Sequence, residues 1–107
     1  MDRHQQIDVF FLAAHRLAVA RLREQPSRVD EALGVLSRWR AQAGGPSHCD
    51  SYWDEWKRLL DADVDVLEQA VCAPTDHGAT LRSVSPLGRF ITAAERKAML
   101  LQALGVA

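Results

Sequence analysis

The chain contains 107 residues, of which 48% are hydrophobic and 25% charged, and its formal net charge is −1. This composition is that of an ordinary globular protein and excludes a disordered chain, while the length favours one domain. The polar beginning MDRHQQID and the lack of any run of about 18 apolar residues argue against a secretory signal and a membrane span.

The first predicted helix covers residues 2–24 and is apolar on two sides. Its main stripe recurs every three or four residues and consists of Ile7, Phe10, Phe11, Ala14, Leu17, Ala18 and Leu22. Leu12 and Val19 project from the opposite side. Such a helix is either central in the fold or covered by another chain, and we favour another chain because a small bundle rarely surrounds its first helix. We therefore predict a partner-binding face made of Leu12, His15, Arg16, Val19 and Arg23.

The second predicted helix covers residues 28–43. Ser27 and Asp30 have the spacing of an N-cap followed by an acid, and Gly44 suits the position just after the helix. The inner stripe of this helix is predicted to contain Val29, Ala32, Leu33, Leu36, Trp39 and Ala43.

The third predicted helix covers residues 48–61 and belongs to the most aromatic stretch of the chain. Residues 33–60 contain Trp39, Trp53 and Trp56 together with the only tyrosine. Because each large aromatic side chain buries about 150–250 Å², we expect the rest of the chain to pack around this stretch. The same spacing fits a surface groove, but we favour the core because the tryptophans coincide with aliphatic stripes.

Two shorter helices are predicted over residues 64–72 and 76–83. Their candidate capping residues are Asp61 or Asp63 for the first and Thr75 or Asp76 for the second. Residues 73–91 also contain the breakers Pro74, Gly78, Pro86 and Gly88. The sequence therefore leaves open whether this segment is ordered.

The last predicted helix covers residues 93–104. Thr92 and Glu95 have the spacing of a capping box, and Gly105 ends the helix. Its inner face is predicted to contain Ala94, Ala98, Leu101 and Leu104. Since no strand of useful length is visible, the sequence predicts an all-α, compact, single-domain bundle of five or six short helices over residues 1–107.

A zinc site can be assembled on paper from His48, Cys49, Cys72 and His77. However, His48 and Cys49 are adjacent, whereas zinc ligands are usually separated by two to five residues. Two cysteines are also too few for a disulfide framework, so we expect a reducing, cytoplasmic location. We predict no bound metal and no cofactor.

Candidate bases for a hydrolase or nuclease are His15, His48 and His77. Such an enzyme needs a nucleophile, a base and an orienting group that converge in a pocket. None of the three histidines has a recognisable companion motif. We therefore predict no catalytic residue and keep a small hydrolase or nuclease as the second alternative.

Charge is divided unevenly along the chain. Residues 1–46 carry seven arginines and five acids, residues 50–76 carry eight acids against Lys57 and Arg58, and residues 82–97 carry four bases and one acid. An ordinary solvated surface accounts for these charges, because a nucleic-acid binder normally has a dominating basic face. As the first alternative function, a DNA-binding regulator would contact phosphates through Arg89, Arg96 and Lys97.

The segments RWR…YWDEWKRLL and LRSVSPLGRFITAAERKAML resemble short bacterial all-helical proteins whose genes often lie beside toxin–antitoxin or mobile-element genes. The resemblance covers about residues 28–101 and follows the order R-W-x-R…W-x-x-W-x-x-L-L…L-R-x-S-S-P. This chain departs from the pattern at residues 82–86, where Val84 separates two serines that are adjacent in the pattern. The resemblance implies a helical accessory or antitoxin-like protein that acts on a partner, and it supplies no catalytic residue.

These observations favour a non-enzymatic, protein-binding module, antitoxin-like or accessory, that acts through a protein partner or as a homodimer. In this interpretation the first helix contacts a second chain, which could be a toxin, while the acidic middle of the sequence faces a basic partner. Oppositely charged surfaces would raise the association rate more than the affinity.

Overall fold

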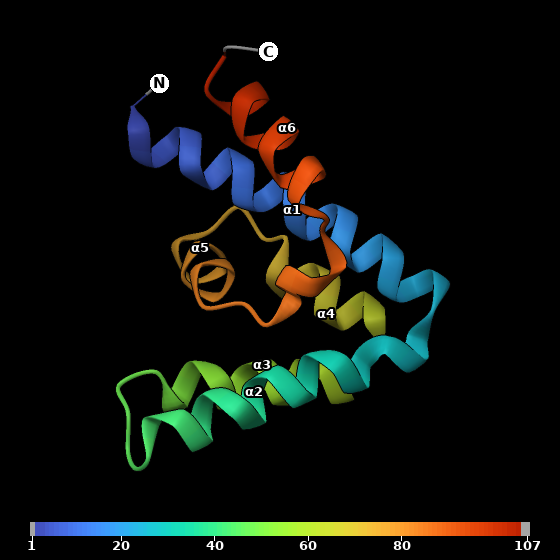
Figure 1. Ribbon diagram of the computed structural model, residues 1–107, viewed down its shortest axis with the longest axis vertical. Coiled ribbons are helices and arrows are strands. Elements are labelled where there is room, and N and C mark those ends of the chain that lie inside the picture. Colours follow the sequence, from blue (N-terminus) through green and yellow to red (C-terminus); the bar gives the residue numbers. More distant parts are fainter. Residues whose placement is uncertain (1, 106–107) are drawn as a thin grey trace.

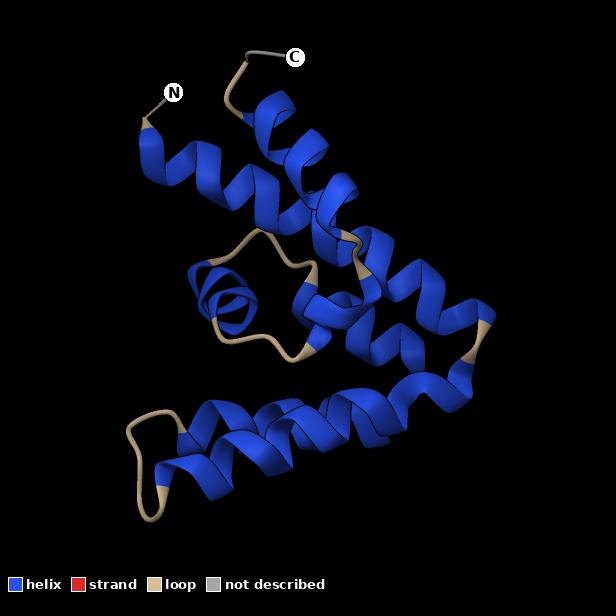
Figure 2. Cartoon of the chain, in the orientation of Figure 1, coloured by secondary structure: helices blue, strands red, loops and turns tan. Residues whose placement is uncertain are grey.

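The computed structural model describes residues 2–105, which form helices joined by loops, with no strand among them (Figure 2). The α helices and the 3₁₀ helices (η) are, in order, α1 (Arg3–Glu24), η1 (Pro26–Arg28), α2 (Val29–Ala43), α3 (Asp50–Asp61), α4 (Val64–Val71), α5 (Asp76–Ser83), η2 (Leu87–Phe90) and α6 (Ala93–Ala103). The predicted compact, all-α bundle is confirmed, and the described α helices begin and end within about two residues of the predicted bounds. In this part of the chain no helix is both long and apolar enough to cross a lipid bilayer.

Helix α1 is the centre of the fold. It packs against α4, α5, η2 and α6, while α2 and α3 lie side by side at the opposite end of the molecule (Figure 1). Its second half is enclosed by the chain itself, because Ala18 is 1% and Val19 0% exposed. The expectation that another chain covers the side of α1 that carries Val19 is therefore wrong for this half. The short helix α4 packs against α1 and binds Arg23 of this half through Asp65 and Glu68.

Two of the three tryptophans lie in the core, which confirms the core interpretation of the aromatic stretch. Trp56 is 0% and Trp53 9% exposed, whereas Trp39 is half-buried with its ring centroid 6.2 Å from that of Trp53. The buried indole N–H of Trp56 donates to the carbonyl oxygen of Leu81 at 3.0 Å. This bond satisfies the polar atom of the aromatic core residue and ties α3 to α5.

The ends of the helices follow the capping signals of the sequence with one exception. Thr92 and Glu95 form the predicted capping box, and Gly44 adopts the left-handed conformation, with φ 71°, just after α2. The side chains that cap α4 and α5 are those of Asp63 and Thr75. Ser27, the predicted cap of α2, instead lies inside η1, because the preceding proline starts a 3₁₀ turn that runs directly into α2.

Helix α6 faces α1 with a different side from the one predicted. The predicted inner face contained Ala94, Ala98, Leu101 and Leu104, but the two alanines are exposed and the two leucines half-buried. Arg21 of α1 binds the Glu95 carboxylate with both Nη atoms, one of them 2.7 Å from Oε1. Because this pair fixes the rotation of α6 about its own axis, Met99, one turn further along, packs against the core.

Residues 73–91, whose order the sequence left open, form α5, η2 and the loops around them. Leu81, Leu87 and Phe90 of this segment are at most 2% exposed and belong to the core. Gly78 is also buried, since α5 passes close to the backbone that follows α4. The segment is therefore an integral part of the bundle.

Replacing Gly78 by alanine is expected to lower the free energy of unfolding by about 1–3 kcal/mol. A Cβ atom built at this position would lie 2.4 Å from the carbonyl oxygen of Ala73, and this neighbour is backbone that cannot rotate away. Gly34→Ala is the matched control, because the nearest atom to its new Cβ is 3.8 Å away. That control should gain about 0.5–1 kcal/mol from helix propensity. Urea unfolding of both variants measures the difference, and equal stability would refute the close approach.

Candidate functional site

A shallow groove runs along the seam between α1 and α6. It has a volume of about 270 Å³ and is lined by Val9, Ala13, Met99, Gln102 and Ala103. We refer to these five residues as the α1–α6 groove. Val9 is 45% exposed and is one of two large hydrophobic residues in the described chain that are classed as exposed. The groove is thus a mainly apolar surface with a single polar side chain.

Leu12 and Arg16, two of the predicted partner-binding residues, do not line this groove but precede and follow Ala13 on α1. Together with Val9 and Ala13 they follow the spacing of one helical face, at steps of three, one and three residues. Leu12 is half-buried and Arg16 is exposed. Of the five predicted partner-binding residues, Leu12 and Arg16 therefore remain candidates for contact with a partner, and the groove adds Val9 and Ala13, which were not predicted.

The other three predicted partner-binding residues are already engaged within the chain. Val19 is 0% and His15 6% exposed, so the prediction that they face outward is wrong. Arg23 is at the surface but binds Asp65 at 2.5 Å and Glu68 at 3.1 Å. Helix α4 packs against α1 and supplies both carboxylates, whereas His15 lies near Trp56 of α3.

Part of the acidic middle of the sequence is neutralised within the fold. Besides the pair with Arg23, Arg40 binds Asp54, and His77 Nε2 lies 2.8 Å from a carboxylate oxygen of Glu55. Several of the acids that suggested a basic partner therefore serve to join α1 to α4, α2 to α3 and α3 to α5.

Arg89, Arg96 and Lys97, the predicted phosphate contacts, are all exposed. Arg89 lines a depression between α2 and η2, whereas Arg96 lines a pocket beside α1. Lys97 lines neither of these surfaces.

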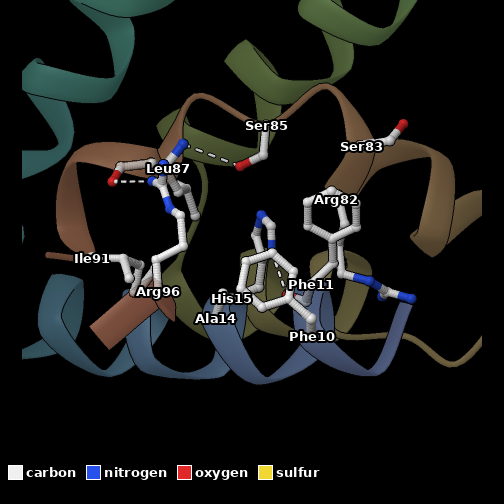
Figure 3. Close-up of a pocket in the computed structure, with 12 residues that line it drawn as sticks. Phe10, Phe11, Ala14, His15, Arg82, Ser83, Ser85, Leu87, Ile91 and Arg96 are labelled. Atoms are coloured by element: carbon white, nitrogen blue, oxygen red, sulfur yellow. Dashed lines mark hydrogen bonds between the residues drawn. The ribbon is translucent and has the colours of Figure 1, made fainter. Parts of the chain in front are cut away.

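A second pocket, of about 270 Å³, lies between α1, the end of α5, η2 and α6 (Figure 3). We call it the His15 pocket. Its walls are mainly apolar, with polar groups from two arginines, two serines and one histidine; the residues are Phe10, Phe11, Ala14, His15, Ala18, Arg82, Ser83, Ser85, Leu87, Gly88, Ile91 and Arg96. The sequence singled out His15 as a partner contact but gave no indication of this pocket.

His15 is held as a neutral, buried imidazole. Its Nδ1 lies 2.6 Å from the carbonyl oxygen of Phe11, and its ring lies 6.2 Å from the Trp56 ring between centroids. Burial is the main cause that lowers the pKa of His15 from 6.5 to about 4; the bond to Phe11 opposes this shift, and the nearby charge of Arg82 makes a smaller contribution in the same direction as burial. The other ring nitrogen, Nε2, is buried and has no hydrogen-bond partner among the described residues.

Arg82 is almost entirely buried and connects three helices. Its Nη1 donates to the carbonyl oxygens of Val71 at 2.9 Å and Ala73 at 2.8 Å, and its Nη2 donates to Asp8 at 2.9 Å. The guanidinium thereby satisfies carbonyls at the C-terminal end of α4, where a positive charge is also favoured by the helix dipole. Arg82 is a structural residue that sequence reasoning missed, because its neighbours in sequence do not reveal its partners in space.

The three histidines that were candidate bases lie in different surroundings. His15 belongs to the pocket, His48 is exposed in the loop between α2 and α3, and His77 of α5 pairs with Glu55. Within residues 2–105, none of them is hydrogen-bonded to a hydroxyl or thiol group, and no group of three or more potential metal ligands converges. Cys49 and Cys72 are free thiols, and burial raises the pKa of Cys72.

Comparison of the chain with protein-family models, with curated proteins and with solved structures finds no match. The resemblance of residues 28–101 to bacterial helical proteins therefore stays an expectation. The α1–α6 groove and the His15 pocket are the two candidate functional surfaces of the chain.

Proposed function

We propose that this chain is a non-enzymatic, protein-binding module whose α1–α6 groove receives an amphipathic helix of a different protein. One observation supports the proposal above all others: the end of the molecule where α1 meets α6 is rich in apolar residues and has no fully buried side chain. The buried residues of α1 begin at Ala14, although residues 7–12 include five large hydrophobic side chains. Helix α6 has seven apolar residues among its eleven and buries none of them completely.

Apolar surface of this kind is stabilised when a second macromolecule covers it. Each square ångström of apolar area removed from water contributes about 25 cal/mol, and contiguous exposed patches commonly mark interaction sites. The groove is lined by the small side chains of Ala13 and Ala103 together with the larger Val9 and Met99. Such a depression suits one or two protruding side chains of a helix laid along it.

Charge at the groove favours a different protein over a second copy. Arg16 is exposed, lies three residues beyond Ala13 and forms no ion pair within the described part of the chain. A two-fold dimer through this face would bring two such arginines to one small interface, where like charges oppose each other. We infer a partner helix that places a carboxylate opposite Arg16. A toxin with such a helix would agree with the antitoxin-like role that the sequence resemblance implies.

Val9→Glu is expected to weaken binding of this partner at least about tenfold, because it places a charge in an apolar interface. Val66→Glu is the matched control, since Val66 on α4 is the other exposed large hydrophobic residue, at 50% exposure. The partner is first captured from cells that express the chain and then purified, and its affinity for the wild type and both variants is measured by calorimetry.

The inferred contact between Arg16 and a partner carboxylate gives a second, independent measurement on the chain and its partner protein. Arg16→Glu should weaken binding, and reversal of one partner carboxylate to lysine should restore it. Equal affinity of wild type and Val9→Glu would refute the proposal. So would a wild-type dimer in analytical ultracentrifugation that Val9→Glu converts to monomer, because the occupant of the groove would then be a second copy.

A further inference from the structure

The His15 pocket contains a buried hydrogen-bond acceptor that no part of the described chain satisfies. The Phe11 carbonyl oxygen can only accept, so the Nδ1 atom of His15 must carry the ring proton and donate it. In the neutral imidazole the Nε2 atom then has a free lone pair, and this atom is buried without a partner. In Figure 3 it is directed toward the segment that carries Ser85. An unmet acceptor at such a position costs free energy unless a donor reaches it.

A cation without a carboxylate partner stands at the other side of the same pocket. Arg96 of α6 is exposed and donates to the carbonyl oxygen of Gly88 at 3.3 Å, and it belongs to no ion pair between described residues. Arg82, the second arginine of the pocket, already binds Asp8. Arg96 therefore keeps free N–H groups that suit a carboxylate, for which the planar guanidinium is a bidentate donor.

The remaining walls favour a flat, apolar body between these two polar points. Phe10 and Phe11 come from α1, and Leu87 and Ile91 come from the segment around η2. Their ring and aliphatic surfaces match an aromatic or compact aliphatic molecule. The volume of about 270 Å³ exceeds the roughly 150 Å³ of an apolar cavity that accepts benzene, so a substituted ring fits.

We propose that the His15 pocket binds a small organic carboxylate with an apolar body and a hydroxyl or N–H group. The carboxylate binds Arg96 at the rim, the apolar body lies against Phe10 and Phe11, and the hydroxyl or N–H donates to His15 Nε2. This site is independent of the α1–α6 groove, which uses Val9 and Ala13 on another side of α1. Failure of one proposal therefore leaves the other standing.

The test uses 4-hydroxybenzoate as the probe, with benzoate and phenol as matched probes that lack the donor or the carboxylate. Titrations of the isotope-labelled full chain are followed by the amide and imidazole NMR signals. We expect 4-hydroxybenzoate to shift the signals of His15, Phe11 and Arg96, and each matched probe to bind about tenfold more weakly. If the pocket holds only a single water that donates to His15 Nε2, none of the three probes will bind saturably. That result would overturn the proposal.

Variants separate the site from nonspecific binding. Arg96→Gln should remove the advantage of 4-hydroxybenzoate over phenol, whereas Lys97→Gln, an exposed neighbour that does not line the pocket, should keep it. His15→Phe should remove the advantage of 4-hydroxybenzoate over benzoate. If His15→Phe does not fold, the comparison of Arg96→Gln with Lys97→Gln still tests the proposal, because both substitutions alter exposed side chains. Equal binding of all three probes, or an Arg96→Gln variant that binds like the wild type, would contradict the proposal.

Discussion

Replacing Arg82 by methionine is expected to lower the free energy of unfolding by about 3–5 kcal/mol, the cost typical of removing one member of a buried polar pair. Methionine fills a similar volume but offers no donor to the carbonyl oxygens of Val71 and Ala73, which Arg82 binds at 2.9 and 2.8 Å. Each buried acceptor left without a partner costs about 1–3 kcal/mol. The C-terminal end of α4 also loses the cation that complements its dipole. Equilibrium unfolding in urea measures the loss.

The contribution of the carbonyls is separated from that of the ion pair by a control at Asp8. This carboxylate lies 2.9 Å from Arg82 Nη2 but its side chain is 44% exposed, so water can replace the lost contact. Asp8→Asn should therefore lower stability by less than about 1 kcal/mol. If Arg82→Met and Asp8→Asn proved equally mild, the guanidinium would not be the connection between α4, α5 and α1 that its hydrogen bonds indicate.

The secondary structure was readable from the sequence because its signals are local. Periodic apolar stripes located the helices, and side-chain caps such as Thr92 and Asp63 set their starts. Prolines and glycines marked their ends, with Gly44 in the left-handed conformation as the clearest case. The one false cap, Ser27, failed because a 3₁₀ turn precedes α2, and the signals of 3₁₀ and α starts overlap.

The arrangement of the helices was less predictable, because it depends on pairs that are far apart in sequence. Arg82 meets Asp8 and Arg21 meets Glu95, each across 74 residues. The second pair turns Glu95 of α6 toward α1, whereas the inner face predicted from the apolar residues of this helix did not include Glu95. Val19 was assigned to an external partner for the same reason: nothing in its own neighbourhood indicates that the folded chain buries it.

The candidate sites also contain residues that the local sequence predicts and residues whose roles depend on segments far apart in the sequence. Leu12 and Arg16 were predicted as part of a surface because the first helix carries more apolar residues than one face needs, and in the structure Leu12 is half-buried and Arg16 exposed. The His15 pocket could not be predicted, since its walls come from α1, α5, η2 and α6. What the sequence showed was a histidine within an apolar helix, and only the fold shows that one of its nitrogens lacks a partner.

The stability of the wild-type chain is expected to fall by about 3 kcal/mol as pH is lowered from 6.5 to about 4, through His15 alone. Burial lowers the pKa of this imidazole from 6.5 to about 4. The unfolded chain therefore takes up a proton first, and each bound proton favours the unfolded state until the folded state also binds one near pH 4. The contribution of neutral His15 is complete above pH 6.5 and is lost across this interval.

Urea unfolding at a series of pH values between 7 and 4 tests this expectation against two variants. His15→Phe should flatten the profile in this window, whereas His48→Gln, at an exposed loop position, should keep the wild-type slope. The Glu95 carboxylate, whose bond to Arg21 lowers its pKa from 4.5 to about 2, adds a loss of stability that begins only below about pH 5 and is shared by the wild type and both variants, so the interval between pH 6.5 and 5 reports on His15. A wild-type profile that is flat between pH 6.5 and 4.5 would show that His15 is not held neutral by burial. The same outcome would remove the assignment of a free lone pair to Nε2.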